Sequence, residues 1–537
     1  MHQQTVTNKT SGKFISKNNE RFYLIENMDE MAPFFISVVS NSDHWLFVST
    51  TGGLTAGRVS PETPLFPYET VDKIHDSYLN TGCKTLIRIS SNEQSLVVWE
   101  PFNKEHNGRF KVTRNVYKNV LGNKLCFEEI NHDLKLAYSY TWCTSDKFGF
   151  VRNCQLDNLA SENRNIEIVD GMQNILPAGT PRYTQTNSSN LVDAYKWTEL
   201  DEVSRLAYFT LYSGITDRAE PCESLKANTV FSLGLTEVKT LLSNEQIDGF
   251  KKGQKIVQET LKRGIRGAYF INSLLRLDAN SSQTWQFVAN VEMTQQAVVA
   301  LQQQIKQPEV LAQAIATSVE SGSDALARIM ASADGFQLTA EENVTAHHYA
   351  NVLFNVLRGG IFDEQYVINS QDFAKTIAIF NQPVYQQHQA FLAALPKTIA
   401  FAQLSQLILN QNDLQLTRLA SEYLPISFGR RHGDPSRPWN QFAIKLVDEN
   451  NKRLLSYQGN WRDIFQNWEA LTFSYPEFIE SVIAKFVNAS TVDGYNPYRI
   501  TKEGIDWEVE EPDDPWSYIG YWGDHQIIYL LKFLEVL

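Results

Sequence analysis

Hydrophobic and polar positions in the first 290 residues follow the pattern of β-strands. Short apolar runs rich in β-branched and aromatic residues are separated by clusters of Gly, Asn, Asp and Ser, and helical spacing is nearly absent. The clearest runs are 34–40, 44–50, 84–89, 95–100, 134–142, 164–172, 205–213 and 284–293. Many short antiparallel strands over this length predict a large β-sandwich domain over residues 1–290.

The spacing of apolar residues becomes helical near residue 291. Segments 294–321 and 323–334 are rich in Ala, Gln and Leu, and they predict a helical linker over 291–340. Residues 342–360 predict a helix that stops at a Gly pair, and 384–412 is a longer helical pattern broken near Pro396. We therefore expect an α/α toroid-type helical domain over 341–537.

Long polar segments rich in aromatic residues interrupt this helical region after residue 425. Six of the eleven tryptophans lie between positions 439 and 522. Loops this long inside a compact domain are usually functional, so these segments are the place to look for a site.

Composition narrows the classes of function. The length of 537 residues predicts two or three domains, and the net charge of −13 without a basic block argues against a nucleic-acid partner. No apolar segment approaches the roughly 20 residues of a membrane span, and the N-terminus is unlike a signal peptide, so a cytoplasmic location is the default expectation. Five cysteines without CxxC spacing predict free thiols, with neither a disulfide framework nor a metal site.

The residue types in the long polar segments suit carbohydrate. Sugars present apolar CH faces and a ring of hydroxyl groups, so their sites combine flat aromatic rings with bidentate hydrogen-bonding groups. The candidates are Arg430, Arg431, His432, Asp434, Arg437, Trp439, Trp461, Asp463, Trp468, Trp507, Glu508, Trp516, Trp522, Asp524 and His525. Any single tryptophan among them is more often a core residue than a sugar platform, and only their collective excess favours a site.

Three of these features have a structural alternative. Asn460 and Asp463 have the spacing of a helix N-cap residue and its N3 acid, and a helix end that opens on a cleft could equally hold a catalytic carboxylate. The acidic run over 506–514 is either a solvated loop or the rim of a saccharide cleft. Arg430, Arg431 and His432 could bind phosphate or form a buried ion-pair turn.

The organisation of the chain resembles that of the cellobiose and chitobiose phosphorylase family. Segments 40–68 and 134–172 are similar to the strands and Gly-rich turns of its N-terminal half, and Asn460-Trp461-Arg462-Asp463 is similar to its Asp-Trp-Asn-Asp motif at two of four positions. The resemblance implies a super-β-sandwich, linker helices and an (α/α)6 barrel that is incomplete here, as in a truncated or divergent member. It implies that Trp461 contacts sugar, that Asp463 is the general acid, and that Asn460 and Arg358 contact substrate.

The resemblance also implies an activity. Asp463 would protonate the glycosidic oxygen of a β-linked oligosaccharide while inorganic phosphate, as co-substrate and with no other cofactor, attacks the anomeric carbon. In an inverting hydrolase, a second carboxylate would instead lie about 6.5–9.5 Å from that of Asp463 and activate water. Glu508 and Asp524 are the candidates for this role. A catalytically incomplete carbohydrate-binding or subunit protein is the alternative of another class. A homodimer, or a partner chain that completes the barrel, is also expected.

Overall fold

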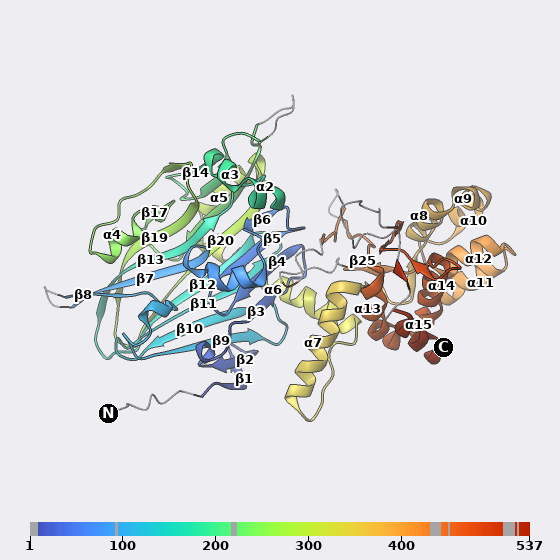
Figure 1. Ribbon diagram of the computed structural model, residues 1–537, viewed down its shortest axis with the longest axis horizontal. Coiled ribbons are helices and arrows are strands. Elements are labelled where there is room, and N and C mark those ends of the chain that lie inside the picture. The colour runs from blue at the N-terminus through green and yellow to red at the C-terminus, as the bar shows by residue number, and fades with distance from the viewer. Residues whose placement is uncertain are drawn as a thin grey trace. The chain divides into compact units, whose positions relative to one another are not determined.

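The computed structural model describes residues 9–91, 95–215, 223–429, 436, 442–448, 452–507, 521–522 and 526–537. The chain divides into two compact units, which we call the sandwich unit (Met1–Leu326 with Asp434–Pro438) and the helical unit (Ala327–Gly433 with Trp439–Leu537) (Figure 1). The division falls inside one long helix, α6 (Pro308–Ser332).

Two large antiparallel sheets form the sandwich unit, and a smaller sheet accompanies them (Figure 1). In spatial order, the large sheet is β1 (Ser11–Lys17), β2 (Glu20–Glu26), β9 (Val112–Asn119), β10 (Leu125–Asn131), β11 (Leu136–Ser145), β12 (Gly149–Asn158), β20 (Ser282–Thr294), β16 (Lys226–Leu233), β15 (Ala207–Leu211), β14 (Lys196–Leu200) and β18 (Leu261–Arg263). The second is β17 (Lys239–Leu241), β19 (Gly267–Leu277), β13 (Arg164–Ile175), β7 (Gly82–Ser91) and β8 (Ser95–Trp99). The third is β3 (Phe35–Val38), β4 (His44–Ser49), β5 (Leu54–Arg58) and β6 (Pro64–Phe66).

The two large sheets pack face to face. Their common core takes Tyr138 and Phe150 from one sheet and Ile87 and Ile168 from the other. Successive strand residues point to opposite faces, so Val169 faces away from this core, into a second cluster that includes Phe250 of α4 (Ile247–Lys251). Each of the eight apolar runs predicted from the sequence contains a strand, and the prediction of large antiparallel sheets is confirmed.

Helices cover the other face of the large sheet. Leu301 of α5 (Gln295–Ile305), together with Leu311 and Ile315 of α6, packs with Phe231 and Val288 of the sheet. The segment predicted as a linker therefore contributes to the core of the sandwich unit.

A buried polar network joins the two large sheets. Asp170 of β13 accepts hydrogen bonds from Thr85 (2.7 Å), from the Arg152 guanidinium (3.0 Å) and from the Trp285 indole (2.7 Å). The Arg152 guanidinium lies over the Tyr140 ring, 4.7 Å from its centroid. Asp170 and Arg152 are both 0% exposed, so the ion pair is fully removed from water.

The helical unit consists of short helices and small sheet fragments. Its helices are α7 (Glu342–Gly359), α8 (Ser370–Phe380), α9 (Gln382–Gln387), α10 (Gln389–Ala394), α11 (Phe401–Leu409), α12 (Leu414–Ser421), α13 (Trp461–Ser474), α14 (Ile479–Ala489) and α15 (Gln526–Val536). Three pairs of strands are β21 (Ile361–Phe362) with β24 (Ile426–Ser427), β22 (Val367–Asn369) with β23 (Thr398–Ala400), and β26 (Tyr495–Asn496) with β29 (Tyr521–Trp522). A three-stranded sheet has the order β25 (Gln458–Asn460), β27 (Arg499–Thr501) and β28 (Gly504–Asp506).

The predicted helix ends agree with this arrangement. The helix predicted over 342–360 ends at the Gly pair, where Gly360 has a φ of +82°. The pattern over 384–412 is divided at Pro396 into separate helices and the short strand β23. α13 packs against α7 and α15, but the described helices form no closed ring, so the (α/α)6 barrel stays a prediction.

The sequence predicted no membrane span and predicted free cysteine thiols. Among the helices that the structure describes, none is long and apolar enough to cross a membrane. Cys126, Cys143 and Cys154 are buried free thiols and Cys83 is a half-buried one, while Cys222 lies outside the described residues.

Candidate functional site

The candidate site is the junction at which β25 becomes α13. The Trp461 N–H donates to the Tyr498 carbonyl (3.0 Å), so the first residue of the helix is tied to the chain leading into β27. Asp463 lies in the first turn of α13 and is half-buried. The sequence placed Asn460 correctly at the N-cap position, but the capping hydrogen bond predicted for its side chain is absent.

Strand pairing aligns three polar residues beside this junction. Asn460 of β25 is opposite Arg499 of β27, which is opposite Asp506 of β28. Residues directly opposite in antiparallel strands share one face of the sheet, so an amide, a guanidinium and a carboxylate lie side by side. The Arg499 Nε donates to the Asp506 Oδ2 (2.6 Å), and both side chains remain partly exposed. These are groups that recognise hydroxyl and phosphate oxygens.

Two buried polar atoms at the junction lack a partner. Neither the Asn460 Oδ1 nor the Trp461 Nε1 makes a hydrogen bond to any residue that the structure describes, although both atoms are buried. A buried polar group without a partner loses the hydrogen bonds it made to water, and such groups are rare in native proteins. Their occurrence at adjacent residues singles out this junction from the rest of the helical unit.

The predicted role of two tryptophans as sugar platforms needs correction. Trp461 is 1% exposed and packs against Phe465 and Phe486, and Trp468 is 0% exposed with its indole N–H donating to the Gly359 carbonyl (2.9 Å). They are core residues, because apolar spacing along α13 turns both rings toward the interior. Contact of Trp461 with sugar would require the helix to move.

Three other predicted site residues are Trp507, Trp522 and Arg358. Trp507, directly after β28, is 37% exposed. Trp522 lies in β29, where its backbone pairs with Tyr495. Arg358 lies in the last turn of α7, its guanidinium 3.2 Å from the centroid of the Phe354 ring, and its contact with substrate stays a prediction.

Several predicted site residues lie outside the residues that the structure describes. They are Arg430, Arg431, His432, Asp434, Arg437, Trp439, Glu508, Trp516, Asp524 and His525. Phosphate binding and activation of water by these residues therefore stay predictions. Within the described ranges, no group of three or more His, Cys, Asp or Glu side chains could hold a metal ion.

A polar cluster ties the segment 362–425 to the β27–β28 hairpin, and no sequence pattern predicted it. The Tyr423 hydroxyl donates to the Asp372 carboxylate (2.7 Å), and the Lys502 ammonium, at the tip of the hairpin, binds the same carboxylate. Burial lowers the pKa of Lys502, and the charge of Asp372 opposes that effect. Asp372 lies 51 and 130 residues from its partners, so no local pattern could have revealed the cluster.

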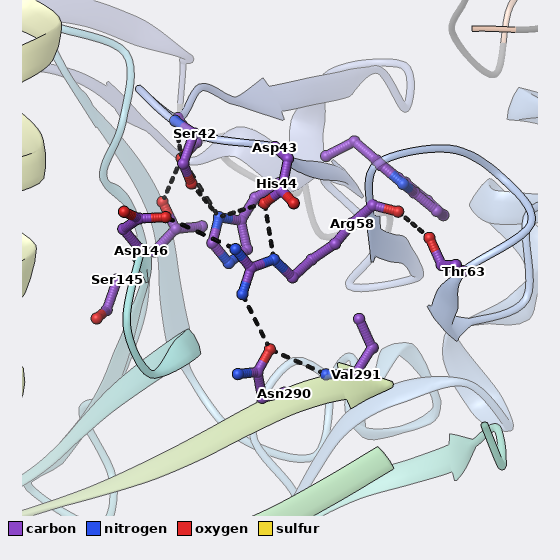
Figure 2. A network of polar contacts seen from close by, with 12 residues as sticks. Ser42, Asp43, His44, Arg58, Thr63, Ser145, Asp146, Asn290 and Val291 are labelled. Carbon is purple, nitrogen blue, oxygen red and sulfur yellow. Dashed lines mark hydrogen bonds and ion pairs between the residues drawn. The ribbon is translucent and has the colours of Figure 1, made fainter. Parts of the chain in front are cut away.

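The segment 40–68 carries a charged cluster of its own in the sandwich unit (Figure 2). Arg58 of β5 donates to Asp43 (2.7 Å) and Asn290 (3.3 Å), and its guanidinium lies 3.6 Å from the Asp146 carboxylate. Arg58 thus holds together the turn before β4, the β11–β12 turn and strand β20. We interpret this cluster as structural, because every donor nitrogen of Arg58 has an acceptor nearby.

One comparison with known proteins finds a domain family that matches part of the chain. Residues 362–425 match the model of glycoside hydrolase family 149 insertion domain 1, and a search of curated proteins finds no match.

Three solved structures are similar at low level. A bacterial glucoamylase complexed with acarbose is 8% identical, with 85% of this chain and 58% of that chain covered and a TM-score of 0.38. A putative kojibiose phosphorylase from the human microbiome is 9% identical, with 88% and 46% covered and a TM-score of 0.27. A putative aldose 1-epimerase from Klebsiella pneumoniae subsp. pneumoniae is 10% identical, with 56% and 91% covered and a TM-score of 0.25.

These structural likenesses are too weak to support a mechanism, and the chain spans only 58% of the glucoamylase. The domain match is to glycoside hydrolase family 149 and not to the cellobiose and chitobiose phosphorylases. The match supports a link to carbohydrate-active enzymes of the glycoside hydrolase type for residues 362–425.

Proposed function

We propose that this protein is a carbohydrate-active enzyme of the inverting glycoside phosphorylase type, with Asp463 as the general acid. The observation that supports the proposal is the placement of Asp463 in the first turn of α13. This turn directly follows Asn460, which shares a face of the small sheet with Arg499 and Asp506. The same unit contains the segment that matches a glycoside hydrolase insertion domain, and Asp372 of that segment binds the β27–β28 hairpin.

In the proposed reaction, Asp463 gives its proton to the glycosidic oxygen of a β-linked oligosaccharide. The bond from that oxygen to the anomeric carbon breaks, and an oxygen of inorganic phosphate attacks the anomeric carbon from the opposite face. The products are a shortened saccharide and an inverted sugar 1-phosphate, and Asp463 is left ionised. Arg430, Arg431 and His432 would hold the phosphate, whose negative charge makes a protein base unnecessary.

The local structure sets a condition on this role. The N-terminal end of a helix stabilises a negative charge by about 0.3–1 kcal/mol, which favours the ionised form of a first-turn carboxylate. A general acid must carry its proton, so apolar walls and the bound sugar must outweigh the helix.

An inverting hydrolase is the nearest alternative, with Glu508 or Asp524 activating water. A binding protein without catalysis is the alternative of another class. The burial of Trp461 and Trp468 favours the binding protein, because buried rings cannot serve as the sugar platforms that a catalytic site was expected to use.

The test is turnover of β-linked glucosides, with and without phosphate, by the wild-type chain and the Asp463→Asn variant. We expect release of a sugar 1-phosphate that depends on phosphate and falls by about 10²–10⁴-fold in Asp463→Asn. Glu480→Gln is the matched control, because Glu480 is an exposed acid in the first turn of α14.

Full turnover by Asp463→Asn would contradict both enzymatic versions, and phosphate-independent release would favour the hydrolase. Saccharide binding detected by tryptophan fluorescence, without product under any condition, would favour the binding protein.

A further inference from the structure

The sandwich unit contains a recess with a volume of about 40 Å³, on residues that no comparison assigns to a site. Its walls come from the turn after β4, from the short helix η2 (Ser77–Leu79), from β7 and from the turn after β8. A water molecule needs about 10–15 Å³ by this measure, so the enclosed part holds a few waters or one edge of a sugar ring. Gly52 forms part of the rim, and the space above its Cα is open.

The buried polar network described above fixes the floor of the recess. Thr85 lies in the floor and its hydroxyl donates to Asp170. Tyr140 lies beside it, with its ring against the Arg152 guanidinium. A ligand in the recess would therefore meet side chains that are held in place before it arrives, which lowers the entropy lost on binding.

Opposite charges line one wall. The Lys84 ammonium lies 3.7 Å from the Glu100 carboxylate, and Lys251 binds the same carboxylate at 2.7 Å. Burial works against the ionised form of Glu100, but the hydrogen bond and charge of Lys251, aided by Lys84, leave its pKa below the ordinary value. The wall thus offers a charged acceptor beside a charged donor.

Aromatic rings and a strained turn complete the recess. Tyr78 and Phe102 line it, and Phe102 has a φ of +65°, in the left-handed region that bulky residues rarely adopt. The Glu129 carboxylate holds this conformation by accepting from the Phe102 N–H (2.6 Å). Strain of this kind persists only where the surrounding structure enforces it, and it is concentrated at ligand sites.

The recess is suited to binding and not to thiol chemistry. Burial raises the pKa of the Cys83 thiol in its wall to about 11, so the thiol stays protonated near neutral pH. Paired charges, hydroxyl groups and aromatic rings match a neutral polyhydroxylated ligand, whose OH groups both donate and accept.

We propose that this recess binds the terminal residue of a saccharide by one edge of its ring. Glu100 accepts from and Lys84 donates to sugar hydroxyl groups, while Tyr78 and Phe102 pack against CH groups. The ligand class rests partly on the proposed function, but the residues that form the site do not include Asp463, and all of them belong to the sandwich unit.

Hydrogen–deuterium exchange with cellobiose as the probe tests the proposal, because mass spectrometry of peptides reports each region separately. We expect cellobiose to slow exchange in peptides covering 76–86 and 98–104 of the wild-type chain. Lys84→Met and Tyr78→Ala should each abolish that protection. Tyr183→Ala and Lys13→Met are the matched controls, since these side chains are exposed in the same unit and should leave it intact.

Asp463→Asn separates this site from the proposed catalytic one. Protection at 76–86 and 98–104 should persist in that variant, whatever happens to turnover. Absence of protection in these two peptides of the wild-type chain would overturn the proposal, and so would protection that survives both Lys84→Met and Tyr78→Ala. Protection confined to peptides around 458–506 would overturn it as well and assign saccharide binding to the helical unit.

Discussion

Asp170 in the sandwich unit and Asp463 in the helical unit are both carboxylates near tryptophans, yet their surroundings differ. Asp170 is 0% exposed, and each of its oxygens accepts a hydrogen bond from a fixed donor. Asp463 is half-buried, and the neighbouring Asn460 and Trp461 each keep a buried polar atom without a partner.

The difference separates a structural network from a candidate site. Both oxygens of the buried Asp170 carboxylate accept hydrogen bonds from fixed donors, so this carboxylate stabilises one arrangement of the two sheets. A junction that leaves polar atoms unpaired stabilises the fold less, and a bound molecule could supply the missing partners. The comparison predicts that substitutions in the Asp170 network affect stability and that substitutions at the β25–α13 junction affect binding.

The largest expected effect comes from breaking the buried ion pair. Asp170→Asn keeps the shape of the side chain but leaves the Arg152 charge buried without its counter-ion. We expect a loss of about 3–5 kcal/mol in the free energy of unfolding, measured by urea denaturation.

Glu26→Gln is the control for that experiment. It removes one partner of the Lys13–Glu26 pair (2.7 Å), whose side chains are 54% and 34% exposed, and should cost less than about 1 kcal/mol. Equal losses in the two variants would refute the view that the Asp170 network stabilises the sandwich.

A smaller effect is expected from Lys485 in the helical unit. Lys485 is 5% exposed and lies over the Tyr457 and Phe380 rings, and no described carboxylate lies within ion-pair distance. Burial lowers its pKa to about 8 from an ordinary 10.5, with the charge of Glu422 opposing. Burial therefore disfavours the charged form in the folded state and lowers the free energy of unfolding. This loss of stability is complete below pH 8 and disappears as the pH rises toward 10.5.

Lys485→Met removes that penalty. We expect the variant to be more stable than the wild type by on the order of 2 kcal/mol at pH 7, with a smaller difference at pH 10. Urea denaturation at both pH values measures it. A variant that is less stable than the wild type at pH 7 would contradict this prediction. It would show that interactions of the Lys485 ammonium stabilise the fold by more than its burial destabilises it.

The smallest expected effect is a difference in the free energy of unfolding between Ala variants of two asparagines at helix N-caps. The Asn369 side chain accepts from two N–H groups in the first turn of α8, whereas Asn460 makes no such bond to α13. Asn369→Ala should cost about 1 kcal/mol, while Asn460→Ala should change the free energy of unfolding by less than about 0.5 kcal/mol.

The same pair of variants also tests the site. Asn460→Ala should weaken saccharide binding and Asn369→Ala should not, as measured by tryptophan fluorescence. A large stability loss in Asn460→Ala with unchanged binding would make Asn460 an ordinary cap.

Sequence patterns predicted the elements well and the roles of single residues less well. The alternation of β-branched and aromatic residues located the strands, and Pro396 and the Gly pair located helix ends, because these signals are local. The same local reasoning could not tell a buried tryptophan from an exposed one. Trp461, Trp468 and Trp507 all follow polar residues, and only the packing of α13 buries the first two.

By itself the sequence determined a strand-rich first half, a helical second half and a carboxylate at the start of a helix, since each depends on residues close together in the chain. Only the tertiary structure decided that Asn460, Arg499 and Asp506 share a face, that Asp170 has all its partners, and that Lys84 and Glu100 line one recess. These relations join distant residues through strand register and core packing, which depend on the burial of the whole apolar surface and are written in no short stretch of the chain.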